Sequence, residues 1–193
     1  MKQDLRRVLL MQRQALTPEQ RAHHDAALGR RLLHWCALHP IDCLGVYWPI
    51  RGEPDLHESY AELARHGLRL ALPVVTGRDA PLSFAAWTPG DALEEGALNV
   101  PVPKTPHRLV TPDALLIPCV GFNKARLRLG YGGGFYDRTL AAMPHRPETW
   151  GVGFELGRMQ TIHPQAHDVP MDHIVTEAGI SLAEGPPATG RIS

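Results

Sequence analysis

Cysteine is scarce in this sequence, with only Cys36, Cys43 and Cys119 among 193 residues. The number is odd, the spacings are unrelated, and each cysteine has apolar neighbours. A disulfide framework would need paired cysteines, and a zinc site would need close, regular spacing. We therefore expect reduced packing residues in a cytoplasmic protein.

Net charge and long apolar segments are also absent. The chain has 20 basic and 20 acidic residues, whereas a domain that coats nucleic acid is normally strongly basic. No apolar run approaches the roughly 20 residues that span a bilayer. The segment MKQDLRRVLL lacks the apolar core of a secretory signal. We expect no nucleic-acid partner and no membrane association.

The common catalytic and phosphate-binding motifs are missing as well. There is no G-x-x-x-x-G-K-[ST] loop, no early G-x-G-x-x-G and no G-x-S-x-G elbow. His163 and His167, four residues apart, could bind zinc on a helix together with Asp168 or Asp172. Pro164 and Pro170 in the same segment disfavour a regular helix there, so zinc is not the favoured interpretation.

The most distinctive feature that is present is the glycine-rich segment 128–138, RLGYGGGFYDR. Glycines allow several backbone N–H groups to converge on one point, and such a set binds phosphate oxygens, above all at a helix N-terminus. Arg128 could clamp a phosphate, and Asp137 could hold a magnesium ion. The alternative interpretation is a loose turn before a helix, because glycine-rich loops alone are a weak signal.

Helices and strands are predicted to alternate along the chain. Thr17 and Gln20 form a capping box, as do Asp55 and Glu58, and Gly67 can end a helix. We expect residues 88–112, rich in Pro, Thr and Gly, to be mostly irregular. The predicted helices are 2–16, 17–38, 55–66 and 134–142; the predicted strands are 43–48, 68–75, 82–87, 114–119, 149–154 and 174–177.

This alternation predicts an α/β fold. The unbroken apolar run Ala114 to Cys119 favours a strand buried on both faces. We expect a single domain, residues 1–184, with a doubly wound, mostly parallel, Rossmann-like sheet between helices on both faces, and a disordered tail, 185–193. Ligands bind such sheets beyond the carboxyl ends of the strands. Polar segments near predicted strand ends are 48–53, 121–137 and the region of Asp172.

Taken together, these motifs resemble the 5-formyltetrahydrofolate cyclo-ligase family. Residues 117–140, IPCVGFNKARLRLGYGGGFYDRTL, are similar to its pattern of an apolar strand, Gly-Phe-Asp-Lys, a linker and Arg-Leu-Gly-x-Gly-x-Gly-Tyr/Phe-Tyr-Asp. KQDLR (2–6) resembles its N-terminal Lys-x-x-x-Arg, and MDHIVTE (171–177) resembles its C-terminal Asp-x-Ile/Val-x-Thr-Glu. Asn123 replaces a frequent aspartate, and the linker 124–127 lacks the usual glycine.

The resemblance implies an enzyme that closes a ring with ATP and Mg²⁺. 5-Formyltetrahydrofolate, with one or more glutamates, would become 5,10-methenyltetrahydrofolate, with release of ADP and phosphate. Phosphorylation of the formyl oxygen would make it a good leaving group, and N10 would then attack the formyl carbon. A protein with this task mainly aligns the reactants and neutralises charge. We expect a monomer.

The resemblance also assigns residues. Asp137 and Asp172 match magnesium-linked carboxylates, Trp48 and Glu53 match substrate contacts, and Tyr131 and Tyr136 are candidates for both ATP and folate. Arg128 and Tyr136 are the catalytic candidates. The residues implied to bind ATP are Lys2, Arg6, Arg128, Leu129, Gly130, Tyr131, Gly132, Gly133, Gly134, Phe135 and Tyr136.

Two other functions remain open from sequence alone. A member of this family could bind folate or nucleotide as a regulator without turnover. A sugar-phosphate isomerase or transferase on a similar sheet is a third possibility, which rests on fold analogy only. A requirement for ATP coupled to folate conversion distinguishes the enzyme from both.

Overall fold

An eight-stranded sheet organises the computed structural model, which describes residues 1–182. In spatial order its strands are β13 (Ile180–Leu182), β12 (His173–Val175), β10 (Glu148–Val152), β7 (Ala114–Pro118), β1 (Cys43–Gly45), β2 (Arg69–Val75), β3 (Leu82–Trp87) and β6 (Leu109–Val110). The tail predicted for 185–193 lies outside the described residues.

The α/β class is confirmed, but the sheet is mixed. The central strands β12, β10, β7, β1 and β2 run parallel. The edges are antiparallel, because β13 pairs with β12 in a tight hairpin and β3 pairs with both β2 and β6. The expectation of a doubly wound, Rossmann-like parallel sheet is therefore not confirmed. Short connections such as 176–179 favour antiparallel pairing, since a parallel crossover needs a dozen or more residues.

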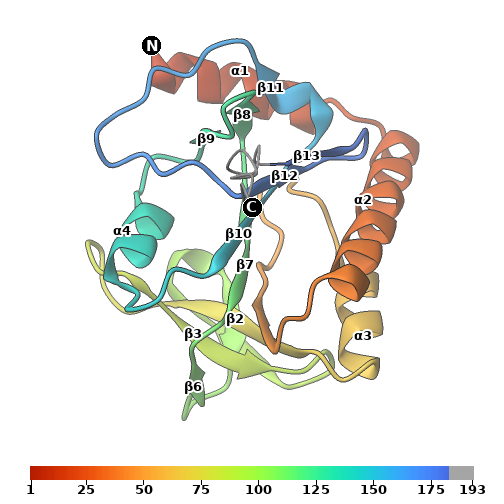
Figure 1. Cartoon of the computed structure of the whole chain (residues 1–193), viewed down its shortest axis with the longest axis vertical. Helices are drawn as coiled ribbons and strands as arrows, with labels where there is room; N and C mark the ends of the chain where they lie inside the picture. Colours follow the sequence, from red (N-terminus) through yellow and green to blue (C-terminus); the bar gives the residue numbers. More distant parts are fainter. Residues whose placement is uncertain (183–193) are drawn as a thin grey trace, which may run out of the picture.

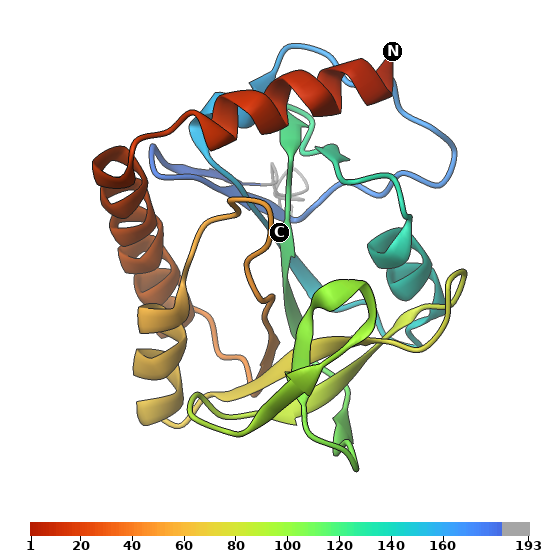
Figure 2. The same ribbon diagram turned by 180° about the vertical axis from the view of Figure 1, so that it is seen from behind.

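Helices lie on both faces of the sheet (Figure 1). α2 (Pro18–Leu38) and α3 (His57–Arg65) cover one face, and α4 (Phe135–Ala142) covers the other. α1 (Lys2–Gln14) lies across the top of the molecule, above the point where the chain leaves β7 and β10, as the view from behind also shows (Figure 2). Among residues 1–182, no helix has the length and apolar character to cross a membrane.

Short elements connect these layers. β8 (Gly121–Asn123), β9 (Arg128–Leu129) and β11 (Arg158–Met159) form a three-stranded sheet beside α1. β11 follows the 3₁₀ turn η2 (Glu155–Gly157). The segment 88–112, predicted to be irregular, contains β6 and a hairpin of β4 (Leu93–Glu95) and β5 (Pro101–Pro103), with the 3₁₀ turn η1 (Ala97–Asn99) between them. Strands this short show too little alternation to be recognised in sequence.

Helix boundaries follow the sequence signals closely at α2 and less closely at α3. Thr17 Oγ1 accepts a hydrogen bond from Gln20 N (3.1 Å), and Gln20 returns one to Thr17 N (2.9 Å), so the predicted capping box is confirmed. At α3 the N-cap is Leu56 instead of Asp55. Asp55 Oδ1 still accepts from His57 N at 3.1 Å, which caps the first turn from one residue further back.

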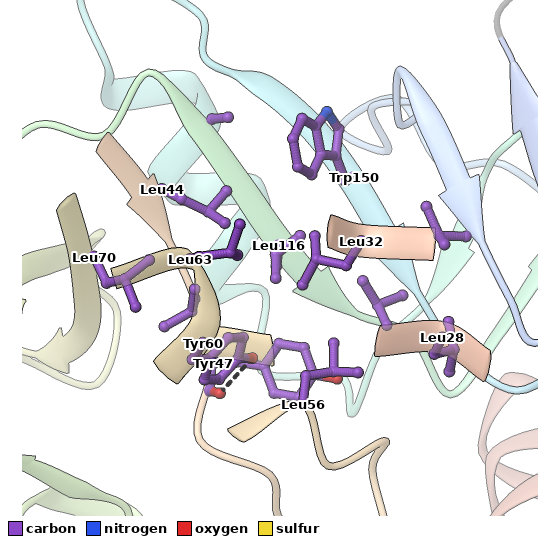
Figure 3. Close-up of a cluster of buried hydrophobic side chains, with 14 of the residues drawn as sticks. Leu28, Leu32, Leu44, Tyr47, Leu56, Tyr60, Leu63, Leu70, Leu116 and Trp150 are labelled. Atoms are coloured by element: carbon purple, nitrogen blue, oxygen red, sulfur yellow. Dashed lines mark hydrogen bonds between the residues drawn. The ribbon is translucent and has the colours of Figure 1, made fainter. Parts of the chain in front are cut away.

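The two faces of the sheet bury separate halves of the core. Leu28 and Leu32 of α2 and Tyr60 and Leu63 of α3 pack on one face against Leu44, Leu116 and Trp150 (Figure 3). On the other face α4 contributes Leu140, which packs with Leu115, Ile117 and Phe84. Successive residues of β7 point to opposite faces, so a strand covered on both sides must be apolar throughout. This is the physical basis of the run 114–118.

The capping box of α2 gives a test of local stability. We expect Thr17→Ala to lower the free energy of unfolding by about 1 kcal/mol, because the N–H of Gln20 loses its acceptor. Thr17→Ser keeps the hydroxyl and is the matched control. Urea unfolding followed by tryptophan fluorescence measures the difference. Equal stability of the Ala and Ser variants would show that the capping box does not contribute.

Candidate active site

A cavity of about 160 Å³ lies between α1, the glycine-rich loop and the segment 165–168. It opens where the chain has left the carboxyl end of β7, so its position agrees with the expectation for α/β sheets. The structure brings every residue that the sequence assigned to ATP to this one cavity. Its lining comprises Lys2, Arg6, Pro118, Arg128, Leu129, Gly130, Tyr131, Gly132, Gly133, Gly134, Phe135, Tyr136, Asp137, Gln165, His167 and Asp168.

The inward face of α1 is basic. Lys2, Arg6 and Arg13 recur at intervals of four and seven, on the same side of the helix as buried Leu9. Leu9 anchors that side against Val120, Leu129 and Ile162. Leu5 and Val8, although apolar, lie away from this side and are 38% and 46% exposed. The cations on this side meet polar groups instead of a hydrophobic core: Lys2 and Arg6 line the cavity, and Arg13 contacts Arg51 O and the Tyr131 hydroxyl.

The glycine loop takes conformations that L-residues rarely adopt. Gly132 has φ of 100° and Gly134, the N-cap of α4, has φ of 68°. A Cβ on Gly132 would lie 3.4 Å from the guanidinium carbon of Arg6. Arg6 Nε donates to Gly130 O at 2.7 Å, which attaches α1 to the loop. The loop therefore runs directly into the positive end of α4, with the Arg6 cation against its backbone.

Arg128 is held at the rear of the cavity. Its guanidinium lies 5.4 Å from the centre of the Tyr136 ring, and Nη2 is 3.8 Å from Asp137 Oδ1. Its buried Nε has no hydrogen-bond partner within the described part of the chain. Burial raises the pKa of Tyr136, so its hydroxyl stays protonated and neutral at physiological pH. Arg128 is thus a fixed cation with an unused donor.

Asp137 has two neighbours with metal-binding side chains. One ligand atom from each of Asp137, His167 and Asp168 lies within 4.8 Å of the others. Lys2 Nζ is 3.3 Å from Asp168 Oδ2. Burial alone would raise the pKa of Asp168, but the N–H of Gln165 and the Lys2 ammonium bring it below its ordinary value. Two carboxylates, Asp137 and Asp168, therefore lie close together in the lining of the cavity.

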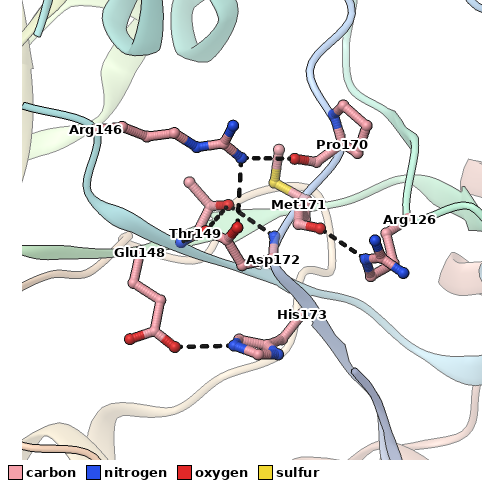
Figure 4. Close-up of polar contacts among 8 residues, drawn as sticks. All are labelled: Arg126, Arg146, Glu148, Thr149, Pro170, Met171, Asp172 and His173. Carbon is pink, nitrogen blue, oxygen red and sulfur yellow. Dashed lines mark hydrogen bonds and ion pairs between the residues drawn. The ribbon is translucent and has the colours of Figure 1, made fainter. Parts of the chain in front are cut away.

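Asp172, predicted as the second magnesium carboxylate, does not join this group. It precedes β12 and lies beside Thr149, near the start of β10 (Figure 4). Its Oδ2 accepts hydrogen bonds from Thr149 N (2.8 Å) and Oγ1 (3.0 Å), and its Oδ1 lies 3.5 Å from Arg146 Nη2. These contacts join two strand starts. The carboxylate of Asp172 therefore has a structural role there, away from the glycine-rich loop.

Glu53 meets the site through Tyr131. The Glu53 side chain is buried, with the whole residue 4% exposed. The Tyr131 hydroxyl donates to Glu53 Oε1 at 2.8 Å, and Ile50 N donates to Oε2 at 3.3 Å. Burial raises the pKa of Glu53 to about 7, although the Tyr131 hydrogen bond and the nearby arginines Arg13 and Arg51 oppose the shift. Trp48, from the same segment, instead packs on His57 and Trp87 and does not line the cavity.

Sequence reasoning missed two residues of this site. Arg13 is 3% exposed and contacts Tyr131, and the available signal was its spacing of four from the apolar Leu9. Asp168 was considered only as a zinc ligand beside His167. The sequence carries no signal for this role, because only Asp172 fits the family's Asp-x-Ile/Val-x-Thr-Glu pattern.

The departures from the family pattern have local structural explanations. Asn123 is buried, and its Oδ1 accepts from Leu127 N at 3.0 Å, which closes the β8–β9 turn. In the linker without glycine, Arg126 adopts the left-handed φ of 59°. Its Nε donates to Met171 O at 2.9 Å, and Met171 N donates back to Arg126 O at 2.9 Å. An arginine can therefore hold the turn where the family pattern has glycine.

Known proteins similar to this chain agree with the geometry. Residues 1–177 match the model of the 5-formyltetrahydrofolate cyclo-ligase family. The 5-formyltetrahydrofolate cyclo-ligase of Escherichia coli (strain K12) is 30% identical over 179 residues, covering 90% of this chain and 98% of the relative.

Two solved structures are also similar. The NMR structure of Aquifex aeolicus 5,10-methenyltetrahydrofolate synthetase has a TM-score of 0.85 at 27% identity, covering 99% of this chain and 97% of that one. The 5,10-methenyltetrahydrofolate synthetase from Mycoplasma pneumoniae has a TM-score of 0.75 at 25% identity, with 91% and 98% covered. With family model, relative and fold in agreement, the chain belongs to the 5-formyltetrahydrofolate cyclo-ligase family, a family of ligases.

Proposed function

We propose that this chain converts 5-formyltetrahydrofolate to 5,10-methenyltetrahydrofolate at the expense of ATP. The observation that carries the proposal is one cavity in which Lys2, Arg6 and Arg128 converge on a glycine loop at a helix N-terminus. Cations and backbone N–H groups in this arrangement favour a polyphosphate. The names of the relatives support it too: one is a 5-formyltetrahydrofolate cyclo-ligase, and another is a 5,10-methenyltetrahydrofolate synthetase.

Three cations would bind the triphosphate from different directions. Lys2 and Arg6 approach from α1, and Arg128 approaches from β9. The guanidinium of Arg128 and the backbone of 130–134, which line the cavity, would provide further donors. Arg6 is already hydrogen-bonded to Gly130 O, so nucleotide binding and the position of α1 are linked.

Asp137 and Asp168 fit a magnesium ion. Mg²⁺ on a nucleotide is usually held by one or two carboxylates, with waters and phosphate oxygens completing the shell. Lys2 lies beside Asp168, and Arg128 lies near Asp137. When bound, the ion supplies positive charge beside the phosphates. Lys2 and Arg128 could then leave the carboxylates and bind phosphate oxygens. We propose Asp168, in place of Asp172, as the second carboxylate of the magnesium site.

The folate would lie beside Tyr131, with Glu53 at its far end. A carboxylate can accept hydrogen bonds from the amino and ring N–H groups of a pterin, and the ring of Tyr131 offers a flat surface for stacking. Tyr131 lies between the nucleotide cavity and Glu53. The formyl group of a folate held there would face the phosphate end of the cavity.

The reaction then requires alignment more than covalent chemistry. Transfer of the γ-phosphoryl group to the formyl oxygen breaks the bond to ADP and creates a good leaving group. N10 attacks the formyl carbon, phosphate departs with the C–O bond electrons, and N10 loses its proton. Arg128, fixed over the Tyr136 ring, is positioned to neutralise charge on the transferring group.

The first test is direct. The purified chain with 5-formyltetrahydrofolate, ATP and Mg²⁺ should form a product with the absorbance of 5,10-methenyltetrahydrofolate and release one ADP per product. Reactions lacking one component are the controls, and each should be silent. Folate binding without product would indicate a regulatory protein, and turnover of a phosphorylated sugar without ATP would indicate the isomerase alternative.

The two candidate carboxylates can be separated by matched substitutions. Asp168→Asn should raise the magnesium concentration for half-maximal activity about tenfold or more, because changes even behind a metal ligand have effects of that size. Asp172→Asn should leave this concentration unchanged. It should instead lower the free energy of unfolding by about 1 kcal/mol, because Thr149 and Arg146 lose a charged partner.

A magnesium titration of activity and urea unfolding of both variants provide the measurements. The reverse pattern, in which Asp172→Asn shifts the magnesium dependence and Asp168→Asn does not, would return the metal site to the assignment made from sequence.

A further inference from the structure

The turn that carries Glu53 has an unfavourable backbone conformation. Glu53 N donates to Ile50 O at 2.9 Å, and the two residues between them, Arg51 and Gly52, have φ of 49° and 74°. Left-handed φ is ordinary for Gly52 but unfavourable for Arg51. Such a turn persists only where neighbouring groups hold it.

Two arginines from the helices hold this turn. Arg13, in the last turn of α1, donates to Arg51 O from Nε (3.1 Å) and Nη2 (2.8 Å). Arg21, in α2, donates from Nη1 to Gly52 O at 2.7 Å and from Nη2 to Arg13 O at 2.8 Å. The carbonyl groups of both left-handed residues are therefore fixed by guanidinium groups, which present several donors in a rigid plane.

Arg13 also decides where the proton of Tyr131 points. Arg13 Nη2 and the Tyr131 oxygen are 2.6 Å apart, and Tyr131 is 2.8 Å from Glu53 Oε1. Arginine is a donor only, so the tyrosine oxygen must accept from it. The single hydroxyl proton is then left for Glu53. This chain of two hydrogen bonds favours Glu53 as an acceptor, that is, as the carboxylate.

The same helix thus fixes both halves of the site. Arg6 holds Gly130 O, and Arg13, seven residues later, holds the next residue of the loop, Tyr131. A lysine at 13 would keep the charge but could not contact Arg51 O and the Tyr131 hydroxyl with a rigid fork. Exposed Arg7, on the other side of α1, makes none of these contacts.

We propose that Arg13 is a positioning residue for the folate reaction, which orients Tyr131 and the 50–53 turn so that Glu53 meets the substrate as a hydrogen-bond acceptor. The inference rests on the proposed function, in which Glu53 binds the pterin. Arg13 itself acts through Tyr131 and the turn. The groups that face Glu53 are Tyr131, Arg13, Arg51 and the N–H of Ile50. The side chains of Tyr47, Tyr60, Cys119 and Tyr136 also lie near it, and burial raises the pKa of each, so they stay neutral around pH 7.

The test is the pH dependence of 5-formyltetrahydrofolate affinity, measured by calorimetry so that no turnover is needed. Because Glu53 binds as the carboxylate, affinity of the wild-type chain should fall as pH drops through about 7. Arg13→Met and Tyr131→Phe each remove a contact that lowers the Glu53 pKa. Both should move this fall to higher pH and weaken folate binding at neutral pH by about tenfold or more.

Arg7→Met is the matched control and should behave as the wild type. In the double variant Arg13→Met/Tyr131→Phe, the fold-loss of folate affinity should be smaller than the product of the two single fold-losses. The reason is that both substitutions act on one hydrogen-bond chain. Where turnover is followed, KM for the folate should rise while KM for ATP changes by less than about twofold. Tyr131→Phe carries the test on its own should Arg13→Met fail to fold.

An unchanged pH dependence in both single variants, or fully independent effects in the double variant, would overturn the inference. A wild-type chain that binds 5-formyltetrahydrofolate without converting it would overturn the proposed reaction and leave the assignment of Arg13 to be decided by the same titration. A wild-type chain that binds no folate would overturn both.

Discussion

The arrangement of charge around one small cavity constrains the rest of the molecule. Lys2, Arg6 and Arg128 lie around this cavity, where like charges repel, and Asp168 and Asp137 lie beside two of them. Each carboxylate near a cation lowers the cost of gathering the cations. In the proposed reaction, the cations of these pairs would bind phosphate and the carboxylates would bind the metal. Hydrogen bonds and ion pairs fix the charged groups of the site, and catalysis by alignment requires such fixed groups.

The fold meets this constraint by fixing elements from distant parts of the sequence at one end of the sheet. The buried strand β7 leads into β8, β9 and the glycine loop, and β1 leads into the turn that carries Glu53. α1 then lies over both, with Arg6 on the loop and Arg13 on the turn. Two apolar layers, one on each face of the sheet, pack the strands from which these connections start. Figure 3 shows the layer beneath α2 and α3. A shift of α1 would disturb both halves of the site at once.

Sequence predicted what is local and contiguous. The run 114–118, the capping box of Thr17 and the glycine loop carry their signals within a few residues, and the structure contains each of them. It did not predict properties set by packing: the antiparallel edges of the sheet, the exposed side of α1 with Leu5 and Val8, or the burial of Arg13. Asp168 and Asp172 are four apart in a segment without regular structure, so spacing could not decide which one faces Asp137. Only the course of the folded chain through residues 165–172 brings Asp168, and not Asp172, close to Asp137.

The central claim is that α1 and the glycine loop form one polyphosphate site that takes nucleotide and magnesium together. Calorimetric titration with ATP tests it most directly. ATP should bind about tenfold or more tightly with Mg²⁺ than with a chelator, and Arg6→Met should weaken that binding by a similar factor, because a charged hydrogen-bonding partner is lost. Arg7→Met, on the exposed side of the same helix, should bind ATP as the wild type does. Equal affinity of the Arg6 and Arg7 variants, with no effect of magnesium, would contradict the account.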